Sequence, residues 1–128
     1  MATRSSITVR EKDGLRLSIY CHWDGYPKHV GRLLYNHYNT TKKALKLVSL
    51  GNISSLGKRI KPKKDVIHNF DNSIKNVTVY YGRDMEEENQ EPQKLSNSQS
   101  IDSQEFNYYF DGTKWYVNGV RLTKKMIS

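Results

Sequence analysis

The chain has 128 residues, the length of a single domain, and carries a formal net charge of +8 at pH 7. Hydrophobic residues make up 36% and include many large aromatic rings, so we expect one folded domain over residues 1–128. The short apolar runs exclude a membrane-spanning helix, and the N-terminus lacks the apolar core of a secretory signal. The single cysteine, Cys21, excludes an internal disulfide and a cysteine-rich zinc site. Together these features predict a cytoplasmic protein.

The positive charge is concentrated in the first half of the chain. Residues 1–64 contain 14 Lys or Arg against three Asp or Glu, whereas residues 65–128 contain seven against ten. A basic half favours anionic partners such as nucleotides, nucleic acid or an acidic protein surface. The alternative is a solvated basic face that contributes only to solubility.

Two alternating segments at the start of the chain predict an antiparallel hairpin. Apolar and polar residues alternate over residues 7–10 and 15–21, and Asp13-Gly14 between them suits a tight turn. The alternation places Cys21 on the apolar face of the second strand and His22 on its polar face.

Two helices are expected next. Tyr26-Pro27 opens the first, which apolar spacing extends to about residue 39, because proline suits the first helical turn. Thr40 or Thr41 caps the second helix, and Gly51 occupies the position of a C-terminal cap.

The rest of the chain is predicted to contribute strands and one long loop. Residues 77–81 form a strand, and residues 106–110 and 114–118 form a second hairpin. The polar residues 85–104 are expected to be a mobile loop. The predicted fold class is α+β, with an antiparallel sheet of four to five strands and two helices packed on one face.

A dense cluster of ring-bearing and charged residues lies where the first hairpin leads into the first helix. Its aromatic rings suit stacking on a base, and its imidazole and ammonium groups suit an anion. Arg83, in the turn after an aromatic strand, suits bidentate anion binding. The predicted ligand-binding residues are His22, Trp23, Asp24, Tyr26, Lys28, His29 and Arg83.

Each of these residues also has a purely structural interpretation. Asp24 suits a helix cap, Trp23 and Tyr26 suit core packing, and Arg83 suits an ion pair with Asp84 in a turn. The histidine spacing matches no zinc motif, and no cofactor is implied. No nucleophile motif or closely paired carboxylates are present, which favours a binding protein over an enzyme.

A second group of candidates is purely basic. These residues follow the second helix and the loop after it, and they suit contacts with the phosphates of a nucleic acid. The alternative is a solvated surface, since no aromatic residue is interleaved in the loop. The group comprises Lys42, Lys43, Lys46, Lys58, Arg59, Lys61, Lys63 and Lys64.

Residues 19–31, which contain Cys21-His22-Trp23-Asp24-Gly25-Tyr26-Pro27, resemble a family of small bacteriophage and prophage proteins. The likeness continues through Leu50-Gly51, residues 81–84 and residues 110–117, and it covers most of the chain. The resemblance implies a phage origin and no particular reaction. Because small accessory phage proteins often act against host defence, it also implies a counter-defence role.

Four functions follow from these patterns. The first is sequestration of a small anionic, nucleotide-like ligand in the host cytoplasm. The alternatives are a protein-binding inhibitor of a host defence complex such as a CRISPR effector, a basic nucleic-acid-binding protein, and a small hydrolase that uses His22 and Asp24. The sequence leaves the oligomeric state open, with a homo-oligomer among the alternatives.

Overall fold

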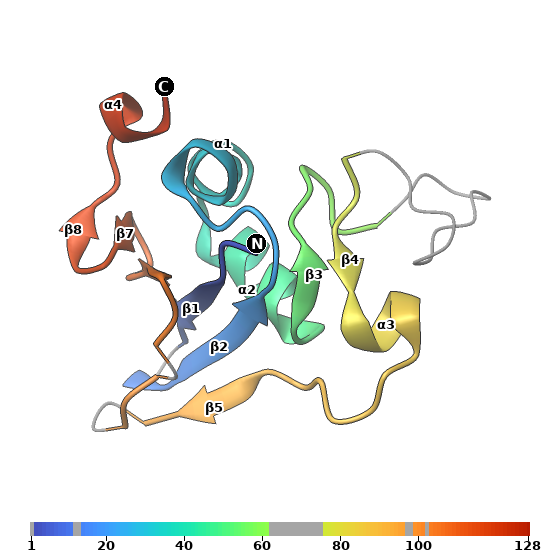
Figure 1. Cartoon of the computed structure of the whole chain (residues 1–128). Helices are drawn as coiled ribbons and strands as arrows, with labels where there is room; N and C mark the ends of the chain where they lie inside the picture. The colour runs from blue at the N-terminus through green and yellow to red at the C-terminus, as the bar shows by residue number, and fades with distance from the viewer. Residues whose placement is uncertain (1, 12–13, 62–75, 97–98, 102) are drawn as a thin grey trace.

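A computed structural model describes residues 2–11, 14–61, 76–96, 99–101 and 103–128 (Figure 1). In chain order its elements are β1 (Ser5–Arg10), β2 (Arg16–Cys21), the π-helical turn η2 (Pro27–Gly31), α1 (Arg32–His37), α2 (Thr41–Ser49), β3 (Ile53–Ser55), β4 (Val79–Tyr80), α3 (Tyr81–Met85), β5 (Gln93–Leu95), β6 (Phe106–Phe110), β7 (Trp115–Val117), β8 (Val120–Arg121) and α4 (Lys124–Ile127). The α+β class is confirmed.

Both predicted hairpins are present. β1 pairs antiparallel with β2, and Val9 faces Leu17 across the pair. β6 pairs antiparallel with β7, and Phe110 faces Trp115 with their rings 5.0 Å apart. The apolar sides of both hairpins join one buried core, so alternation identified these strands correctly.

The sheet is mixed, not antiparallel, and it has more strands than the four or five expected. Its order is β4-β3-β2-β1-β6-β7-β8, and β5 pairs with the part of β2 that β3 leaves free. β1 runs parallel to β6, and β2 runs parallel to β3. The helices between β2 and β3 make the long crossover that parallel neighbours need. β3 and β5, which were not predicted, have three residues each, too few for alternation to reveal them.

The two predicted helices form close to their expected limits. The first begins at Pro27 with a π-helical turn and continues as α1, and α2 begins after Thr40, whose hydroxyl accepts a hydrogen bond from the Lys43 N–H. α2 packs against β1 and β2 (Figure 1). Gly51 ends α2 with a φ of 97°, where a side chain would collide with the Gln90 carbonyl.

Between β5 and β6 the chain crosses from one edge of the first hairpin to the other. β5 pairs with β2, and β6 pairs with β1. Arg16 donates to the Ser96 carbonyl at the start of this crossing, at 2.6 Å. Beneath it, Thr8 and Ser18 are buried and share a hydrogen bond of 2.9 Å. The segment 85–104, which was predicted to be a loop, therefore contains the strand β5 and a residue, Ser96, that is hydrogen-bonded to the first hairpin.

The core lies between the apolar face of the sheet and the helices. Ile7 and Ile19 from the sheet belong to the same buried cluster as Val30 and Leu34 from the first helix and Leu47 from α2. Within the described part of the chain, no helix has the length and hydropathy needed to cross a membrane.

Candidate functional site

The backbone that follows β2 is held in place from several directions. The N–H groups of His22 and Trp23 donate to carbonyls of β3 at 3.2 and 3.0 Å, and the Gly25 N–H donates to the Thr3 carbonyl at 2.8 Å. From the other side, the buried Tyr108 hydroxyl donates to the Gly25 carbonyl at 2.7 Å. These bonds tie residues 22–25 to the N-terminal segment, β3 and β6, which makes the segment a fixed part of the fold.

At Gly25 the backbone passes very close to Thr3 and Ser5. A β-carbon there would lie 2.7 Å from the Ser5 Cβ and 2.8 Å from the Thr3 carbonyl oxygen, and real β-carbons do not come so close. Only glycine lets the chain pass between β1 and the start of the first helix. The Gly25 in the sequence motif is therefore explained by packing.

The two large aromatic side chains on either side of Gly25 point into solvent. Trp23 is 45% exposed and Tyr26 is 41% exposed, whereas the rings of Tyr80, Tyr108 and Phe110 are completely buried. The expectation that Trp23 and Tyr26 fill the core is therefore wrong. Their exposure is notable because exposed tryptophan on a fixed backbone is typical of binding surfaces.

Each exposed ring has a histidine beside it. The His22 and Trp23 rings meet edge to face at 4.7 Å, and the Tyr26 and His29 rings are 6.2 Å apart. On its other side, His22 Nδ1 shares a hydrogen bond of 2.7 Å with the hydroxyl of Tyr20. We use the name aromatic–basic surface for six residues of this segment: His22, Trp23, Asp24, Tyr26, Lys28 and His29.

The charged members of the aromatic–basic surface remain accessible. Lys28 and Asp24 are exposed. Asp24 adopts a left-handed φ of 55°, and its carbonyl accepts a hydrogen bond from the Val30 N–H at 3.3 Å. No side chain caps the helix that starts at Pro27, so Asp24 is not the cap that its position suggested.

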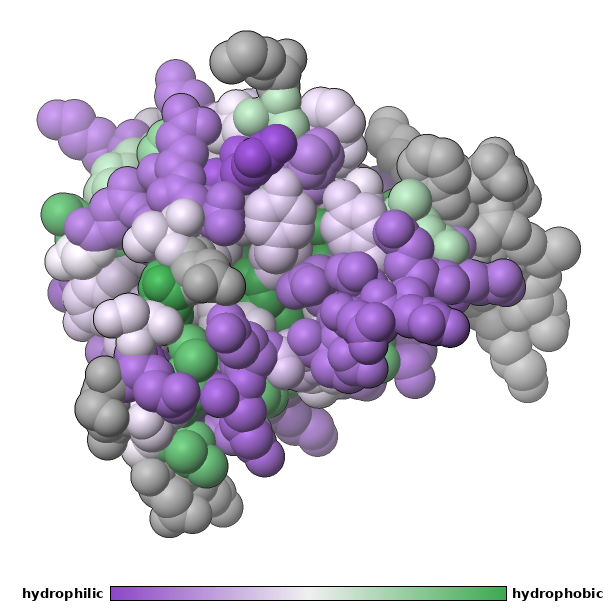
Figure 2. Space-filling view, turned by 60° about the horizontal axis from the view of Figure 1, so that its bottom comes forward, coloured by the Kyte–Doolittle hydropathy of each residue, from purple (hydrophilic) through white to green (hydrophobic). Residues whose placement is uncertain are grey.

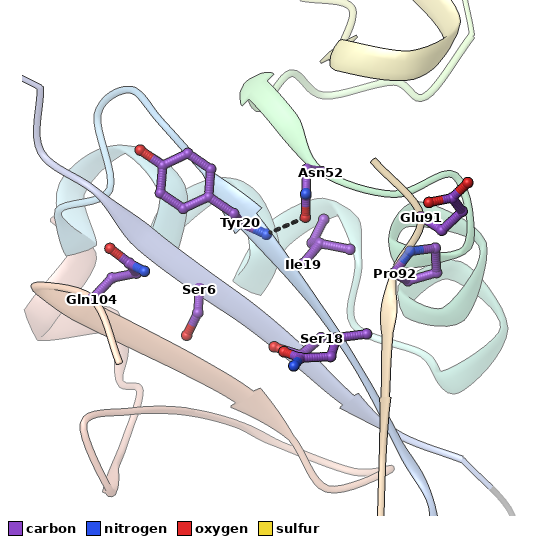
Figure 3. A pocket seen from close by; sticks show the side chains of 9 residues that line it. Ser6, Ser18, Ile19, Tyr20, Asn52, Glu91, Pro92 and Gln104 are labelled. Atoms are coloured by element: carbon purple, nitrogen blue, oxygen red, sulfur yellow. Dashed lines mark hydrogen bonds between the residues drawn. The ribbon is translucent and has the colours of Figure 1, made fainter. Parts of the chain in front are cut away.

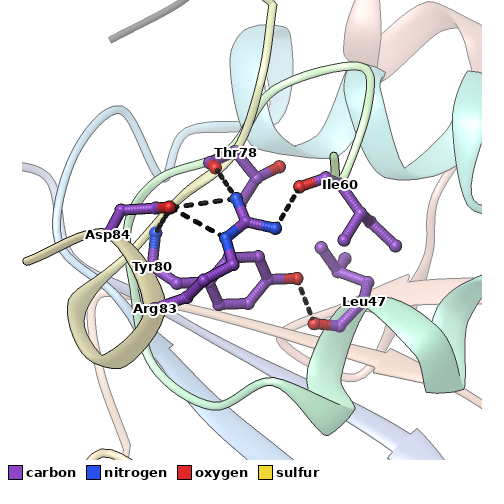
Figure 4. A network of polar contacts seen from close by, with 6 residues as sticks. All are labelled: Leu47, Ile60, Thr78, Tyr80, Arg83 and Asp84. Carbon is purple, nitrogen blue, oxygen red and sulfur yellow. Dashed lines mark hydrogen bonds and ion pairs between the residues drawn. The ribbon is translucent and has the colours of Figure 1, made fainter. Parts of the chain in front are cut away.

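Arg83, the seventh predicted residue, is used inside the fold. Its guanidinium donates to both carboxylate oxygens of Asp84 at 2.8 and 2.9 Å, to the Thr78 carbonyl at 3.0 Å and to the Ile60 carbonyl at 2.6 Å (Figure 4). It also lies over the Tyr80 ring, 4.8 Å from the centroid. These contacts match the structural interpretation of Arg83 and leave its guanidinium little capacity for a ligand.

Chemistry by Cys21 is disfavoured by its surroundings. The thiol is completely buried, and burial raises its pKa from 9.0 to about 12, so it stays protonated at neutral pH. Among the described residues, no group of three His, Cys, Asp or Glu side chains is arranged to hold a metal ion. The arrangement offers stacking, hydrogen bonding and positive charge.

A polar hollow beside the aromatic–basic surface was missed from the sequence. It has a volume of about 400 Å³ and lies on the polar face of the first hairpin (Figure 3). The residues that line it are Ser6, Ser18, Ile19, Tyr20, Asn52, Glu91, Pro92, Gln93 and Gln104. Alternation along β2 places Ser18 and Tyr20 on this face, but no sequence signal brings Gln93 and Gln104 to it.

The predicted basic group is divided over two segments. Lys42, Lys43 and Lys46 are exposed on α2. Lys58, Arg59 and Lys61 are exposed in the segment after β3, and Lys63 and Lys64 lie outside the described residues.

The side chains of the aromatic–basic surface combine ring faces with positive charge. Trp23 and Tyr26 present apolar faces, and Lys28 presents an ammonium group nearby in the chain. Both features suit a ligand that combines a ring with a negative charge. Comparisons of the chain with protein-family models, with curated proteins and with solved structures find no match.

Proposed function

We propose that the protein binds and sequesters a small anionic, nucleotide-like ligand on the aromatic–basic surface. The observation that carries the proposal is that Trp23 and Tyr26 are exposed on a backbone fixed by hydrogen bonds to three other parts of the chain. Exposing these rings forfeits the free energy of burying them. A ligand that covers them recovers it without reorganising the loop.

The residues of the surface divide the recognition between them. An aromatic ring that packs on an apolar face of the ligand contributes affinity, with an upper value of about 1–3 kcal/mol for a fully stacked base. Lys28 is positioned to attract the phosphate, and the nearby imidazoles of His22 and His29 offer hydrogen bonds to it. Sequestration needs affinity and no bond-breaking step, which agrees with the inert Cys21.

The biological setting of this proposal comes from the resemblance to phage proteins. A phage protein that removes a nucleotide-type signal from the host cytoplasm would weaken a defence that depends on the signal. Such a protein acts by binding its ligand one for one, so its Kd must lie below the working concentration of the signal.

A nucleotide titration tests the proposal. Mononucleotides, dinucleotides and cyclic nucleotides are added to the purified protein while its melting temperature is recorded. A ligand at a hundred times its Kd stabilises the fold by about 2.7 kcal/mol and raises the melting temperature. Mass spectrometry after denaturation then identifies the ligand, which sequestration returns chemically intact.

A pair of variants ties the titration to the surface. Trp23→Ala removes the exposed indole, and Leu50→Ala removes a side chain of similar exposure, 40%, at the end of α2. We expect Trp23→Ala to abolish the ligand-dependent shift and Leu50→Ala to leave it unchanged. If no nucleotide shifts the melting temperature of the unmodified protein, the proposal fails.

A second candidate, nucleic-acid binding, is favoured by the three exposed lysines of α2. Lys42, Lys43 and Lys46 lie outward on one helix, where they can meet phosphates. Binding by these lysines falls steeply with salt, whereas stacking on Trp23 depends on salt much less. Titration of single-stranded RNA at two salt concentrations, repeated with Lys43→Ala, therefore separates the two candidates.

A third candidate, inhibition of a host defence complex such as a CRISPR effector, is favoured by the same exposed rings. Trp and Tyr are enriched at the centres of protein interfaces. Recovery of a stoichiometric protein partner from host lysate, lost with Trp23→Ala and kept with Leu50→Ala, would favour this candidate over nucleotide binding.

A further inference from the structure

The polar hollow and the aromatic–basic surface are neighbours that share a chain of contacts. Tyr20 lines the hollow, and its hydroxyl is bonded to His22 Nδ1 at 2.7 Å. The Tyr20 and His22 ring centroids are 5.9 Å apart, and those of His22 and Trp23 are 4.7 Å apart. Trp23 is thus joined through His22 to a residue that lines the hollow.

Most polar groups around the hollow are already paired. The Ser6 hydroxyl donates to Asn107 at 2.8 Å, and Ser18 is paired with Thr8. The Asn52 side chain accepts from the Tyr20 N–H at 2.9 Å and donates to Gln90 at 3.1 Å (Figure 3). These bonds fix the floor of the hollow and leave its remaining polar groups to decide what binds.

The side-chain amides of Gln93 and Gln104 make no hydrogen bond to any described residue, and both line the hollow. Gln93 lies on β5 opposite Ser18, and Gln104 lies at the end of the crossing segment. Figure 3 shows Gln104 beside Ser6 and Tyr20, with Glu91 and Pro92 on the opposite side. Gln93 and Gln104, eleven residues apart in the chain, thus bring to one hollow two carboxamides that have no partner among the described residues.

Charges of both signs lie around the hollow. The Glu91 carboxylate lines one side. Arg4 lies close enough to Tyr20 to oppose the rise in the pKa of Tyr20 that burial causes. Neither sign of charge therefore dominates around the hollow. Figure 2 shows one face of the molecule, on which hydrophilic side chains predominate. An uncharged group with several hydrogen-bonding atoms suits this environment best.

We infer that the hollow selects the ligand by its nucleobase, which Gln93 and Gln104 recognise through hydrogen bonds while Trp23 and Lys28 supply affinity. This inference rests on the proposed function, because it assigns a role within the same ligand. A carboxamide has a donor beside an acceptor, the pattern that pairs with the edge of a base such as adenine. The volume of about 400 Å³ lies in the range of small-molecule sites.

Calorimetric titration with AMP, GMP, CMP, UMP and ribose 5-phosphate tests the inference. Ribose 5-phosphate carries the phosphate and sugar without a base. We expect at least one nucleotide to bind several-fold to about tenfold more tightly than ribose 5-phosphate, since a single net hydrogen bond to its base changes affinity by about that factor. Gln93→Ala and Gln104→Ala should each reduce that preference several-fold.

A neighbouring residue provides the matched control. Lys94 follows Gln93 on β5 and is exposed, and it pairs with Leu17, so its side chain points to the other side of the strand. Lys94→Ala should leave the preference for the nucleotide unchanged. Circular dichroism and melting temperature establish that each variant is folded before its affinity is compared.

The outcomes separate this inference from the proposed function. Loss of discrimination in the two glutamine variants, with unchanged discrimination in Lys94→Ala, supports the inference. Nucleotide binding that depends on Trp23 but not on either glutamine overturns the inference and leaves the proposed function standing. Ribose 5-phosphate that binds as tightly as every nucleotide also overturns it. The absence of binding by all five probes overturns the inference, and the proposed function fails with it if no dinucleotide or cyclic nucleotide shifts the melting temperature.

Discussion

Two segments that follow strands contain similar residue types but have opposite structural roles. After β2, Trp23, Asp24 and Gly25 combine an aromatic ring, a carboxylate and a glycine, and after β4 residues 81–84 do the same. In the first segment the backbone is bonded to the rest of the fold and the side chains face solvent. In the second, the Arg83 and Asp84 side chains are themselves the internal contacts (Figure 4).

The difference lies in what each segment packs against. At Gly25 a β-carbon would collide with Ser5 and Thr3, and Tyr108 binds the carbonyl, while the Trp23 and Tyr26 side chains on either side are exposed. Near β4, the carbonyls of Ile60 and Thr78 accept the N–H groups of Arg83. A charged side chain that satisfies backbone groups is held in the fold, and one that does not is free for a ligand.

The largest expected loss of stability is at residues 81–84, the segment whose side chains make internal contacts. Asp84→Asn removes the carboxylate that pairs with Arg83 and accepts the Tyr80 N–H at 2.8 Å, and Asp84 is 3% exposed. Breaking one side of such a pair should lower the free energy of unfolding by about 3 kcal/mol in urea titrations. Asp24→Asn, at the exposed aspartate, should change it by less than about 0.5 kcal/mol. Equal effects at the two sites would contradict the comparison.

A smaller effect is expected where the exposed segment touches the fold. Gly25→Ala inserts a β-carbon 2.7 Å from Ser5, which should destabilise the protein by about 1–3 kcal/mol and displace the aromatic–basic surface. The control is Gly31→Ala, whose β-carbon would meet nothing nearer than 3.4 Å. Thermal and urea unfolding measure both variants, and an unaffected Gly25→Ala protein would show that the segment is not held as described.

Tyr108→Phe tests a single bond of the same attachment. It removes the hydroxyl that donates to the Gly25 carbonyl at 2.7 Å and keeps the buried ring. We expect a loss of about 1 kcal/mol in the free energy of unfolding. Tyr35→Phe, at a partly buried tyrosine without such a bond among the described residues, should cost less. An equal loss in both would count against the role of this bond.

Trp23→Ala should separate stability from binding. Because the indole is 45% exposed, its removal should change the free energy of unfolding by only about 0.5 kcal/mol. Nucleotide binding should nevertheless be lost, as measured by calorimetry on the same sample. A large loss of stability would instead place Trp23 among the structural residues, beside Arg83.

Cys21, the last residue of β2, should not react with thiol reagents in the folded protein. Its pKa of about 12 and its complete burial keep the thiol protonated, so a thiol reagent at pH 8 should modify only unfolded protein. The sign of the pH dependence follows from the raised pKa. The stability that the neutral thiol contributes is complete below pH 9 and is lost as the pH rises towards 12. Rapid modification under native conditions would contradict this burial.

Local patterns were sufficient for several elements of the fold. Alternation over residues 15–21, proline at position 27, and threonine at position 40 each act within a few residues of the structure they specify, and β2, η2 and α2 begin close to where they predict. The parallel pairings of β1 with β6 and β2 with β3 could not be predicted in this way. They join segments that are far apart in the chain, and two- or three-residue strands carry no periodicity.

The same distinction between local patterns and distant contacts applies to the candidate site. Its composition, from His22 to His29, was visible as a run of rings and charges beside a strand end. The structure alone decided that Trp23 and Tyr26 are exposed, that Arg83 is committed to Asp84, and that Gln93 and Gln104 meet at one hollow. Residue types and short spacings fix which interactions a segment can make. Which of them it does make depends on neighbours supplied by distant parts of the chain.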